Sequence, residues 1–485
     1  MTADLLLQGR LVDAPKGKGR SAGSAFVESA LFWAFIAALA WCPFWFGSNV
    51  LVAWGLNAIL FPGLAAFYEV SLLLRGERHA VAIKHIKMPA VLVVAVVVWI
   101  FLQNATWTPA WVHHPIWQMS ADALERPVEG SVSVSRDLTT LALLRLVTAA
   151  SVFWIALQLC RDASRANLLI SSIAIIVFTY AAYGLVAFAL MPGSVLWYEG
   201  DRRDVVTSTF FNPNSFSAYA GIGLVATCGL ILKLYRDEFL SVGGSIRYRI
   251  SMFIDVTGKK ATILLAGAFV ILVALLLAGS RGGIAAAALS LFCLGVLTTR
   301  MPKKQGPVEQ RKAILVLGVI LVSAVFVVFG DILVGKIARQ GFQDDGRAAV
   351  YVITLRSIFS APLLGYGYGT FLDVFPMFRD HSVSAAGIWG QAHNTYLETL
   401  QGLGLIFGSM LVITIILLAS RCVKGALSRK QVETVPCVAA STAILLGLQA
   451  LVDFSLQIQA IAITFMAVLG AGVAQSKSSQ LRLED

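Results

Sequence analysis

Charged residues are scarce in this chain of 485 residues, and that scarcity excludes an ordinary soluble protein. Only 13% of the residues are charged, whereas 58% are hydrophobic and the mean hydropathy is +0.78. A typical soluble domain has about 25% charged residues. The composition therefore predicts a chain that lies mostly within a membrane.

Cysteine is also sparse, and its arrangement excludes two kinds of site. The chain has six cysteines, and no two of them form a CxxC pair. They fall within predicted apolar segments or near their inner ends: Cys42, Cys160, Cys228, Cys293, Cys422 and Cys437. We expect neither an external disulfide framework nor a metal site.

Apolar runs long enough to cross roughly 30 Å of hydrocarbon recur along the chain. They predict an all-α polytopic membrane protein with about twelve transmembrane helices and no internal duplication. The predicted spans cover residues 29–47, 50–74, 88–104, 139–160, 167–191, 215–235, 261–279, 282–299, 313–333, 395–419, 435–453 and 458–475. Because the first span lacks a clear cleavage site and a second follows at once, we do not interpret it as a cleaved signal peptide.

The distribution of basic residues predicts the orientation of the chain. If the N-terminal tail is cytoplasmic, 26 of the 38 lysines and arginines lie in cytoplasmic segments. Cytoplasmic loops carry such an excess, so we expect both termini in the cytoplasm. The topology also accounts for the net charge of +11, which therefore requires no nucleic-acid partner.

The predicted spans divide the chain into five parts. These are a basic cytoplasmic tail (1–28), transmembrane helices 1–9 (29–333) with an interfacial outer segment (105–138), a periplasmic loop (334–394), transmembrane helices 10–12 (395–475) and a cytoplasmic tail (476–485). The periplasmic loop contains "DDGRAAVYVITLRSIFS", which predicts a surface helix, and then "APLLGYGYGTF". Glycines spaced in this way suit tight turns and close backbone approach. A structured loop of this length is commonly functional.

Four ionisable residues lie at or near the outer ends of predicted spans: Arg145, Arg281, Glu398 and Asp453. Each is a functional candidate, because an unpaired charge at membrane depth is costly. Structural roles are the alternatives. Thr395 and Glu398 have the spacing of a capping box, and Asp453 and Arg145 can form a buried pair.

Three spans begin at the outer side behind residues that suit helix capping. These residues are Asn212, Asn214 and Ser215 before one span, Ser280 before the next, and Asn394 and Thr395 before the third. Helix N-termini beside arginines form anion sites, and arginine suits phosphate. The coincidence of such helix starts with Arg281 and His393 therefore favours a functional site.

Four motifs then carry a family resemblance: "STFFNPNSFSAY" (208–219), "GSRGG" (279–283), "GRAAVYVITLRSIFSAPLLGYGYGTF" (346–371) and "AHNTYLETLQGLGLIFG" (392–408). Their order and spacing resemble the O-antigen ligase and polymerase superfamily, over roughly residues 200–455. These bacterial inner-membrane enzymes move glycans from undecaprenyl diphosphate onto an acceptor. The resemblance implies metal-independent catalysis, a diphosphate site with Arg281 and Arg347, and His393 as the histidine of an "HN" motif.

The chemistry of such a transfer assigns provisional roles. An acceptor hydroxyl needs a general base, and a neutral imidazole fits. His393 is therefore expected to be the base, with diphosphate ligand as its alternative role. The candidate catalytic residues are His393, Arg281 and Arg347. The candidate substrate-binding residues are Arg202, Arg203, Asn212, Asn214, Arg356, Asn394, Tyr396 and Glu398. No cofactor is expected.

The acceptor stays open, because residues 105–138 match no ligase pattern. A lipid A–core or a protein would make the enzyme a ligase, whereas another lipid-linked glycan would make it a polymerase. A transporter or lipid flippase is the main alternative function, although transporters usually show internal repeats and midplane sites. A non-catalytic scaffold of a polysaccharide export complex is a further alternative function. Metal-dependent lipid-phosphate sugar transferases typically carry carboxylates in the first outer loop, and the short connection near Gly47 has none.

Overall fold

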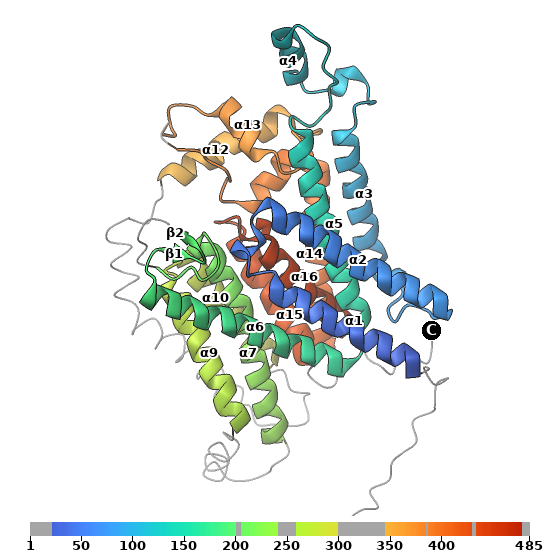
Figure 1. The fold of residues 1–485 in the computed structure, drawn as a ribbon, viewed down its shortest axis with the longest axis vertical. Coiled ribbons are helices and arrows are strands. Elements are labelled where there is room, and N and C mark those ends of the chain that lie inside the picture. Colours follow the sequence, from blue (N-terminus) through green and yellow to red (C-terminus); the bar gives the residue numbers. More distant parts are fainter. Residues whose placement is uncertain are drawn as a thin grey trace, which may run out of the picture.

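The computed structural model describes residues 22–199, 205–240, 259–298, 345–384, 387–428 and 433–477, and these residues are mostly helical (Figure 1). The α-helices are α1 (Ala22–Trp41), α2 (Leu51–Arg75), α3 (Lys87–Asn104), α4 (Ile116–Leu124), α5 (Arg136–Leu159), α6 (Ala163–Leu190), α7 (Pro213–Leu240), α9 (Lys259–Leu277), α10 (Arg281–Thr298), α12 (Asp345–Ser360), α13 (Phe371–Phe378), α14 (Thr395–Ser428), α15 (Thr434–Gln449) and α16 (Gln459–Ala474). Short 3₁₀ helices cover Phe46–Ser48, Ile83–Ile86, Ala110–Val112 and Ser455–Gln457, and strands β1 (Ser194–Val195) and β2 (Tyr198–Glu199) form a small hairpin.

The helices agree with the predicted all-α membrane class. Among the described residues, eight helices are long and apolar enough to cross a membrane, and α1, α15 and α16 contain shorter apolar helices. The predicted ninth span, residues 313–333, lies outside the described residues. The total of twelve spans therefore stays a prediction. The first predicted span also ends earlier than expected, at Trp41, because a tight 3₁₀ turn at Phe46–Ser48 follows it.

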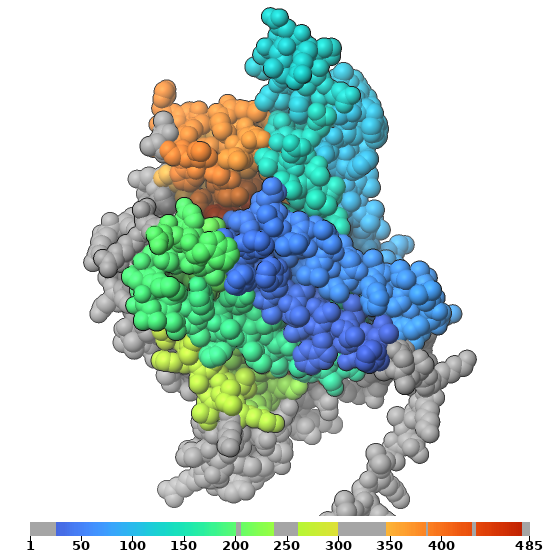
Figure 2. Space-filling model, in the orientation of Figure 1, coloured from blue at the N-terminus to red at the C-terminus, as the bar shows by residue number. Residues whose placement is uncertain are grey.

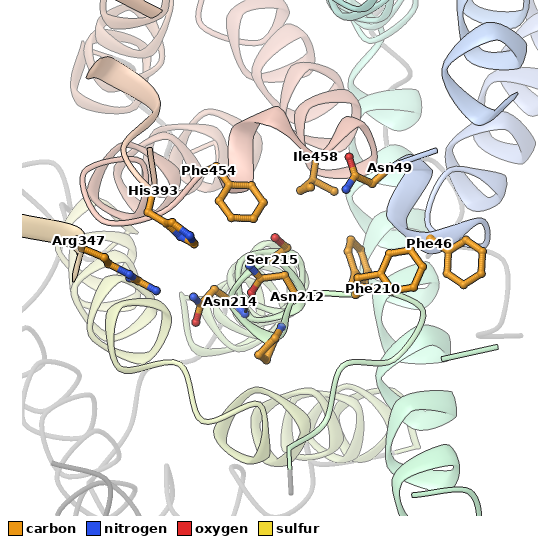
Figure 3. A pocket seen from close by; sticks show the side chains of 12 residues that line it. Phe46, Asn49, Phe210, Asn212, Asn214, Ser215, Arg347, His393, Phe454 and Ile458 are labelled. Carbon is orange, nitrogen blue, oxygen red and sulfur yellow. Dashed lines mark hydrogen bonds between the residues drawn. The ribbon is translucent and has the colours of Figure 1, made fainter. Parts of the chain in front are cut away.

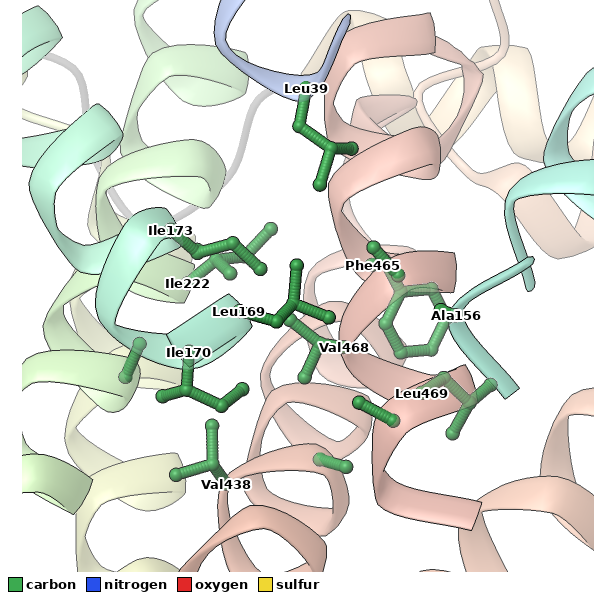
Figure 4. Close-up of a cluster of buried hydrophobic side chains, with 14 of the residues drawn as sticks. Leu39, Ala156, Leu169, Ile170, Ile173, Ile222, Val438, Phe465, Val468 and Leu469 are labelled. Atoms are coloured by element: carbon green, nitrogen blue, oxygen red, sulfur yellow. The ribbon is translucent and has the colours of Figure 1, made fainter. Parts of the chain in front are cut away.

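Helix α16 forms the centre of the core. Almost every residue from Gln459 to Ala474 is buried, and the helix packs against α5 and α15. Its side chains Phe465, Val468 and Leu469 meet apolar side chains from neighbouring helices (Figure 4). Small residues let the backbones approach closely: a Cβ at Gly470 would lie 2.6 Å from a backbone oxygen of α5. Such small-residue contacts are how helices pack in membranes.

Helix α14 is broken at Gly404, whose φ of 76° and ψ of 169° are not helical. The glycine-rich loop after α12 fills the break with backbone hydrogen bonds: Leu405 N–H to Pro362 O (2.7 Å), Tyr366 N–H to Gln401 O (3.1 Å) and Gly367 N–H to Gly402 O (3.0 Å). A Cβ at Gly365 or at Gly404 would lie 2.4 Å from a backbone oxygen. The expected role of these glycines in close backbone approach is confirmed. The break is tolerated because protein groups, rather than lipid, face the freed backbone.

The two long connections lie at the same end of the helical bundle (Figures 1 and 2). One carries α4, and the other carries α12 and α13. The two connections are in direct contact: Val134 N–H in the first donates to Tyr366 O in the second (2.9 Å). The helix predicted after Asp344 is confirmed as α12, and its position along the membrane surface stays a prediction. Helix α13 was not predicted. This end is the one that the charge distribution assigns to the periplasm, an assignment that stays a prediction.

Candidate functional site

A five-residue stretch, 449–453, connects helices that are far apart in the sequence. Four of its residues bond in turn to α7, to the two residues at the start of α14, and to α12. The bonds are Gln449 Nε2 to Asn214 O (2.9 Å), Thr395 N–H to Ala450 O (2.9 Å), Asn394 Nδ2 to Leu451 O (2.9 Å) and Arg347 Nη1 to Val452 O (3.1 Å). The fifth, Asp453, faces His393. We call residues 449–453 the connecting segment.

The start of α7 is fixed by Asn212, as expected for a capping residue. Its Oδ1 accepts from the N–H of Asn214 (2.7 Å), and its carbonyl accepts from the N–H of Phe216 (3.0 Å). Pro213 occupies the first helical position, where its missing N–H costs nothing. Ser215 is only 1% exposed, and its Oγ has no hydrogen-bond partner among the described residues. A buried hydroxyl in this state is unusual and suggests a site for a ligand or water.

The starts of α10 and α14 are also capped as predicted. Ser280 Oγ accepts from the N–H of Gly283 (3.2 Å). Asn394 Oδ1 accepts from the N–H groups of Tyr396 and Leu397 (3.1 Å each). These bonds satisfy amides that the helix itself leaves unpaired.

The expected capping box of Thr395 and Glu398 is wrong. Asn394 is the capping residue, so Glu398 is one residue too far along for that motif. Its carboxylate instead accepts from the N–H of Ala392 and from Gln457 Nε2 (2.6 Å). Glu398 therefore holds the chain that leads into His393 against the segment after Asp453.

His393 is held in an unusual position between α12, α14 and the connecting segment. Its φ is 54°, in the left-handed region, and its carbonyl accepts from the hydroxyl of Tyr351 (2.9 Å). Its Nδ1 lies 3.5 Å from Oδ1 of Asp453, a carboxylate that is only 2% exposed. The second oxygen of Asp453 accepts from the Ser455 hydroxyl. A 3.5 Å contact is longer than a hydrogen bond, and both facing atoms have no hydrogen bond among the described residues.

A pocket of about 470 Å³ opens at this point. Arg347 and His393 lie at one side, and Phe46 and Phe210 lie at the other (Figure 3). The start of α7 forms the floor between them. The full lining is Phe46, Asn49, Phe210, Phe211, Asn212, Pro213, Asn214, Ser215, Arg347, His393, Phe454 and Ile458. The pocket therefore has one cationic side, an amide-rich floor and one aromatic side.

The structure brings four of the predicted site residues to this pocket: His393, Arg347, Asn212 and Asn214. Arg281 is not among the lining residues, although its helix starts beside the pocket, where a Cβ on Gly282 would meet the Val452 side chain at 2.9 Å.

Four further predicted residues lie elsewhere. Asn394, Tyr396 and Glu398 support the start of α14, and the Tyr396 hydroxyl donates to Gly447 O (2.8 Å). Arg356 is exposed and pairs with Asp380 (2.6 Å). Hydrogen bonds from Ser382, together with Arg356, lower the pKa of Asp380 to about 2. Arg202 and Arg203 lie outside the described residues.

The expected pair of Arg145 and Asp453 is also wrong. Arg145 donates to the carbonyl of Gln457, and its guanidinium lies 4.6 Å from the ring centre of Trp54. This cation–π contact and the carbonyl bond provide the favourable surroundings that a buried guanidinium needs. Asp453 is thereby left to face His393.

The sequence did not reveal the aromatic side of the pocket. Phe46 and Asn49 come from the first connection, where the sequence itself indicates only a lack of carboxylates. Phe210 and Phe211 belong to a quoted motif, but no role was assigned to them. Backbone strain marks the same place. Among the described residues, six non-glycine residues have a left-handed φ. Four of them line the pocket or lie within two residues of its lining: Phe46, Ser48, Ser208 and His393.

Fold and pocket together define a multi-pass helical membrane protein with a cationic and aromatic pocket at one end of its bundle. Residues 266–413 match the family described as O-antigen ligase, which confirms the resemblance to the O-antigen ligase and polymerase superfamily. The matched part contains Arg347 and His393. The match supports a glycosyltransferase-type ligase activity at the general level. A comparison with curated proteins found no match.

Proposed function

We propose that the protein transfers a glycan from undecaprenyl diphosphate to an acceptor hydroxyl at the periplasmic face of the bacterial inner membrane. The observation that carries this proposal is the contact between His393 and the buried Asp453. His393 lines the same pocket as Arg347. Arg347 and His393 line the pocket and also lie within the family match. Their side chains are of the types that the reaction needs. One can activate a hydroxyl, and the other can stabilise a diphosphate.

His393 acts as the general base in this proposal. A carboxylate opposite Nδ1 favours the tautomer that carries its proton on Nδ1, which leaves the Nε2 lone pair for the acceptor hydroxyl. As the imidazole takes up a proton, Asp453 stabilises the new positive charge. The same arrangement of a base and an orienting carboxylate serves acyl transfer in unrelated enzymes. Asp453 is therefore a positioning residue, held in turn by Ser455.

Arg347 stabilises the leaving group. One of its N–H groups binds Val452 O, which fixes the guanidinium at the edge of the pocket, where it can meet a phosphate group. Arg281, at the start of α10, is proposed to assist from the adjoining helix end. Negative charge accumulates on the diphosphate as the bond breaks, and positioned guanidinium groups stabilise that charge.

The proposed reaction is a substitution at C1 of the donor sugar. The acceptor oxygen forms a bond to C1 of the donor sugar, and its proton passes to Nε2 of His393. The bond between C1 and the phosphate oxygen breaks, and its electron pair stays on the lipid diphosphate. The imidazolium then returns its proton to solvent or to the diphosphate. We propose that no metal takes part.

The function is tested in a deletion strain, by following the pool of lipid-linked glycan. Loss of the protein should make this pool accumulate, and the wild-type gene should restore turnover. A His393→Gln variant should fail to restore it, whereas His381→Gln, an exposed histidine outside the pocket lining, should succeed. Long accumulated chains would identify a ligase, and single repeats a polymerase. An unchanged pool in the deletion strain would contradict the proposal.

A further inference from the structure

The aromatic side of the pocket continues beyond the pocket itself. Phe46 stacks on Phe211, with ring centres 4.4 Å apart and planes at 10°. Trp197 meets the edge of Phe46 at 5.2 Å, and Tyr198 meets Phe211 at 5.6 Å. Trp197 and Tyr198 belong to the β1–β2 hairpin and are 62% and 56% exposed. These four rings form a continuous aromatic strip that runs from inside the pocket to the surface. In Figure 2 the first connection (blue) and the hairpin (green) that carry the strip adjoin.

The turn that presents Phe46 is rigid. Phe46, Gly47 and Ser48 all have left-handed φ, between 53° and 67°. Ser48 Oγ donates to Cys42 O (2.6 Å), and the buried Asn57 side chain donates to Ser48 Oγ and to Gln459 Oε1 (3.0 Å each). The turn is therefore held by a bond to Asn57 of α2, which is itself bonded to Gln459 of α16, despite its backbone strain. A strained conformation that its surroundings hold in this way is typical of a preorganised binding surface.

Neutral polar groups lie beside the aromatic strip. The amide side chains of Asn49 and Asn214 line the pocket, as does the buried Ser215, whose Oγ has no hydrogen-bond partner among the described residues. Figure 3 shows Asn214 and Ser215 between Phe210 and the pair Arg347 and His393, and Asn49 above Phe210. Amides and hydroxyls both donate and accept hydrogen bonds, which suits a ligand that is rich in hydroxyl groups.

The aromatic strip and the amides beside it together favour a sugar over a polyprenyl chain as the ligand. A sugar ring packs its apolar C–H face against an aromatic ring and forms hydrogen bonds from its hydroxyls to amides. A polyprenyl chain has no groups that can hydrogen-bond to the amides. Exposed Trp and Tyr side chains often anchor a protein at the membrane interface. Anchoring alone, however, requires neither a connection to the pocket nor unpartnered polar groups within it.

We propose that the aromatic strip and its neighbouring amides form a subsite for the sugar rings of the donor glycan. The ring attached to the diphosphate lies in the pocket, with its hydroxyls on Asn49, Asn214 and Ser215. The following rings leave over Trp197 and Tyr198. This inference rests on the proposed transfer function, because it assumes that the diphosphate lies at Arg347.

The subsite is tested with detergent-purified protein and two fluorescent probes followed by anisotropy. One probe is the oligosaccharide released by mild acid from the lipid-linked pool, labelled away from its reducing end. The other is a labelled polyprenyl diphosphate without sugar. Trp197→Ala should weaken oligosaccharide binding about tenfold, the loss of one aromatic contact, and leave polyprenyl diphosphate binding unchanged. Trp197→Tyr should retain most of the affinity. The matched control is Trp111→Ala, since Trp111 is 85% exposed and does not line the pocket.

Equal weakening of both probes in Trp197→Ala would mean a lipid contact and would overturn the inference. So would a wild-type protein that transfers glycan but does not bind the released oligosaccharide. A protein that binds the oligosaccharide through Trp197 but transfers nothing would instead contradict the proposed function and leave the subsite standing.

Discussion

The centre of the bundle and its pocket end are built in opposite ways. After Gln459 the side chains of α16 are small or apolar, and no charged residue lies between Gln459 and Ala474. At the pocket end the chain places a carboxylate against an imidazole, leaves Ser215 Oγ without a hydrogen bond and bends Phe46 and His393 into left-handed conformations. Each of these features costs stability. Features that reduce stability and gather in one place indicate that this place serves function.

The largest effect is expected at the cationic side of the pocket. Arg347→Ala removes a charge that stabilises the leaving diphosphate, so transfer should fall by about 10³-fold or more. Arg347→Lys should restore only part of the rate, because a point charge cannot reproduce the planar fork. The measurement is the transfer rate of purified enzyme at matched protein amounts. Full activity of the alanine variant would remove Arg347 from the site.

A smaller effect is expected where the pocket meets the buried part of the connecting segment. Asp453→Asn keeps the size of the side chain but no longer balances the charge that His393 acquires. We expect kcat to fall roughly tenfold to a hundredfold, with KM for the donor nearly unchanged. Steady-state kinetics measure both quantities. A rise in KM with unchanged kcat would show that Asp453 shapes donor binding and does not position the base.

The broken helix α14 predicts an effect on stability. Gly404→Ala places a Cβ 2.4 Å from Leu363 O and forces a side chain into a conformation that suits only glycine. The strain alone should cost about 1–3 kcal/mol, which lowers the thermal midpoint and the amount of folded protein. Gly295→Ala in α10 is the matched control, because nothing lies within 4 Å of its Cβ. Equal stability of the two variants would mean that the backbone moves away at Gly404.

The smallest effect is expected at Arg356. The sequence made it a substrate-binding candidate, but its guanidinium is exposed and pairs with Asp380 outside the pocket lining. Arg356→Ala should leave the transfer rate and the donor KM essentially unchanged, since an exposed ion pair contributes about 0–1 kcal/mol. Kinetics of this variant beside Arg347→Ala compare two arginines of the same helix. A loss as large as that of Arg347→Ala would extend the diphosphate site along α12.

Local chemistry made much of the fold predictable. Apolar run lengths located the helices, and the capping preferences of Asn212, Ser280 and Asn394 located three of their starts. The partners of the buried charges were not predictable in this way. Arg145 and Asp453 have opposite charges and could form a pair. In the structure the Arg145 guanidinium instead contacts the Trp54 ring and the Gln457 carbonyl, and the Asp453 carboxylate faces His393. The aromatic side of the pocket was missed because Phe46 and Phe211 meet only after folding.

If His393 is the base and Asp453 orients it, removing proton acceptance at residue 393 should remove most of the turnover. His393→Gln keeps the size and hydrogen bonding of the side chain but cannot accept a proton. We expect turnover to fall roughly 10²–10⁴-fold while donor binding persists through Arg347, and the wild-type fall in rate at acidic pH to disappear in the variant. Near-normal turnover of His393→Gln, at matched protein amount and with the acidic fall intact, would contradict this role of His393.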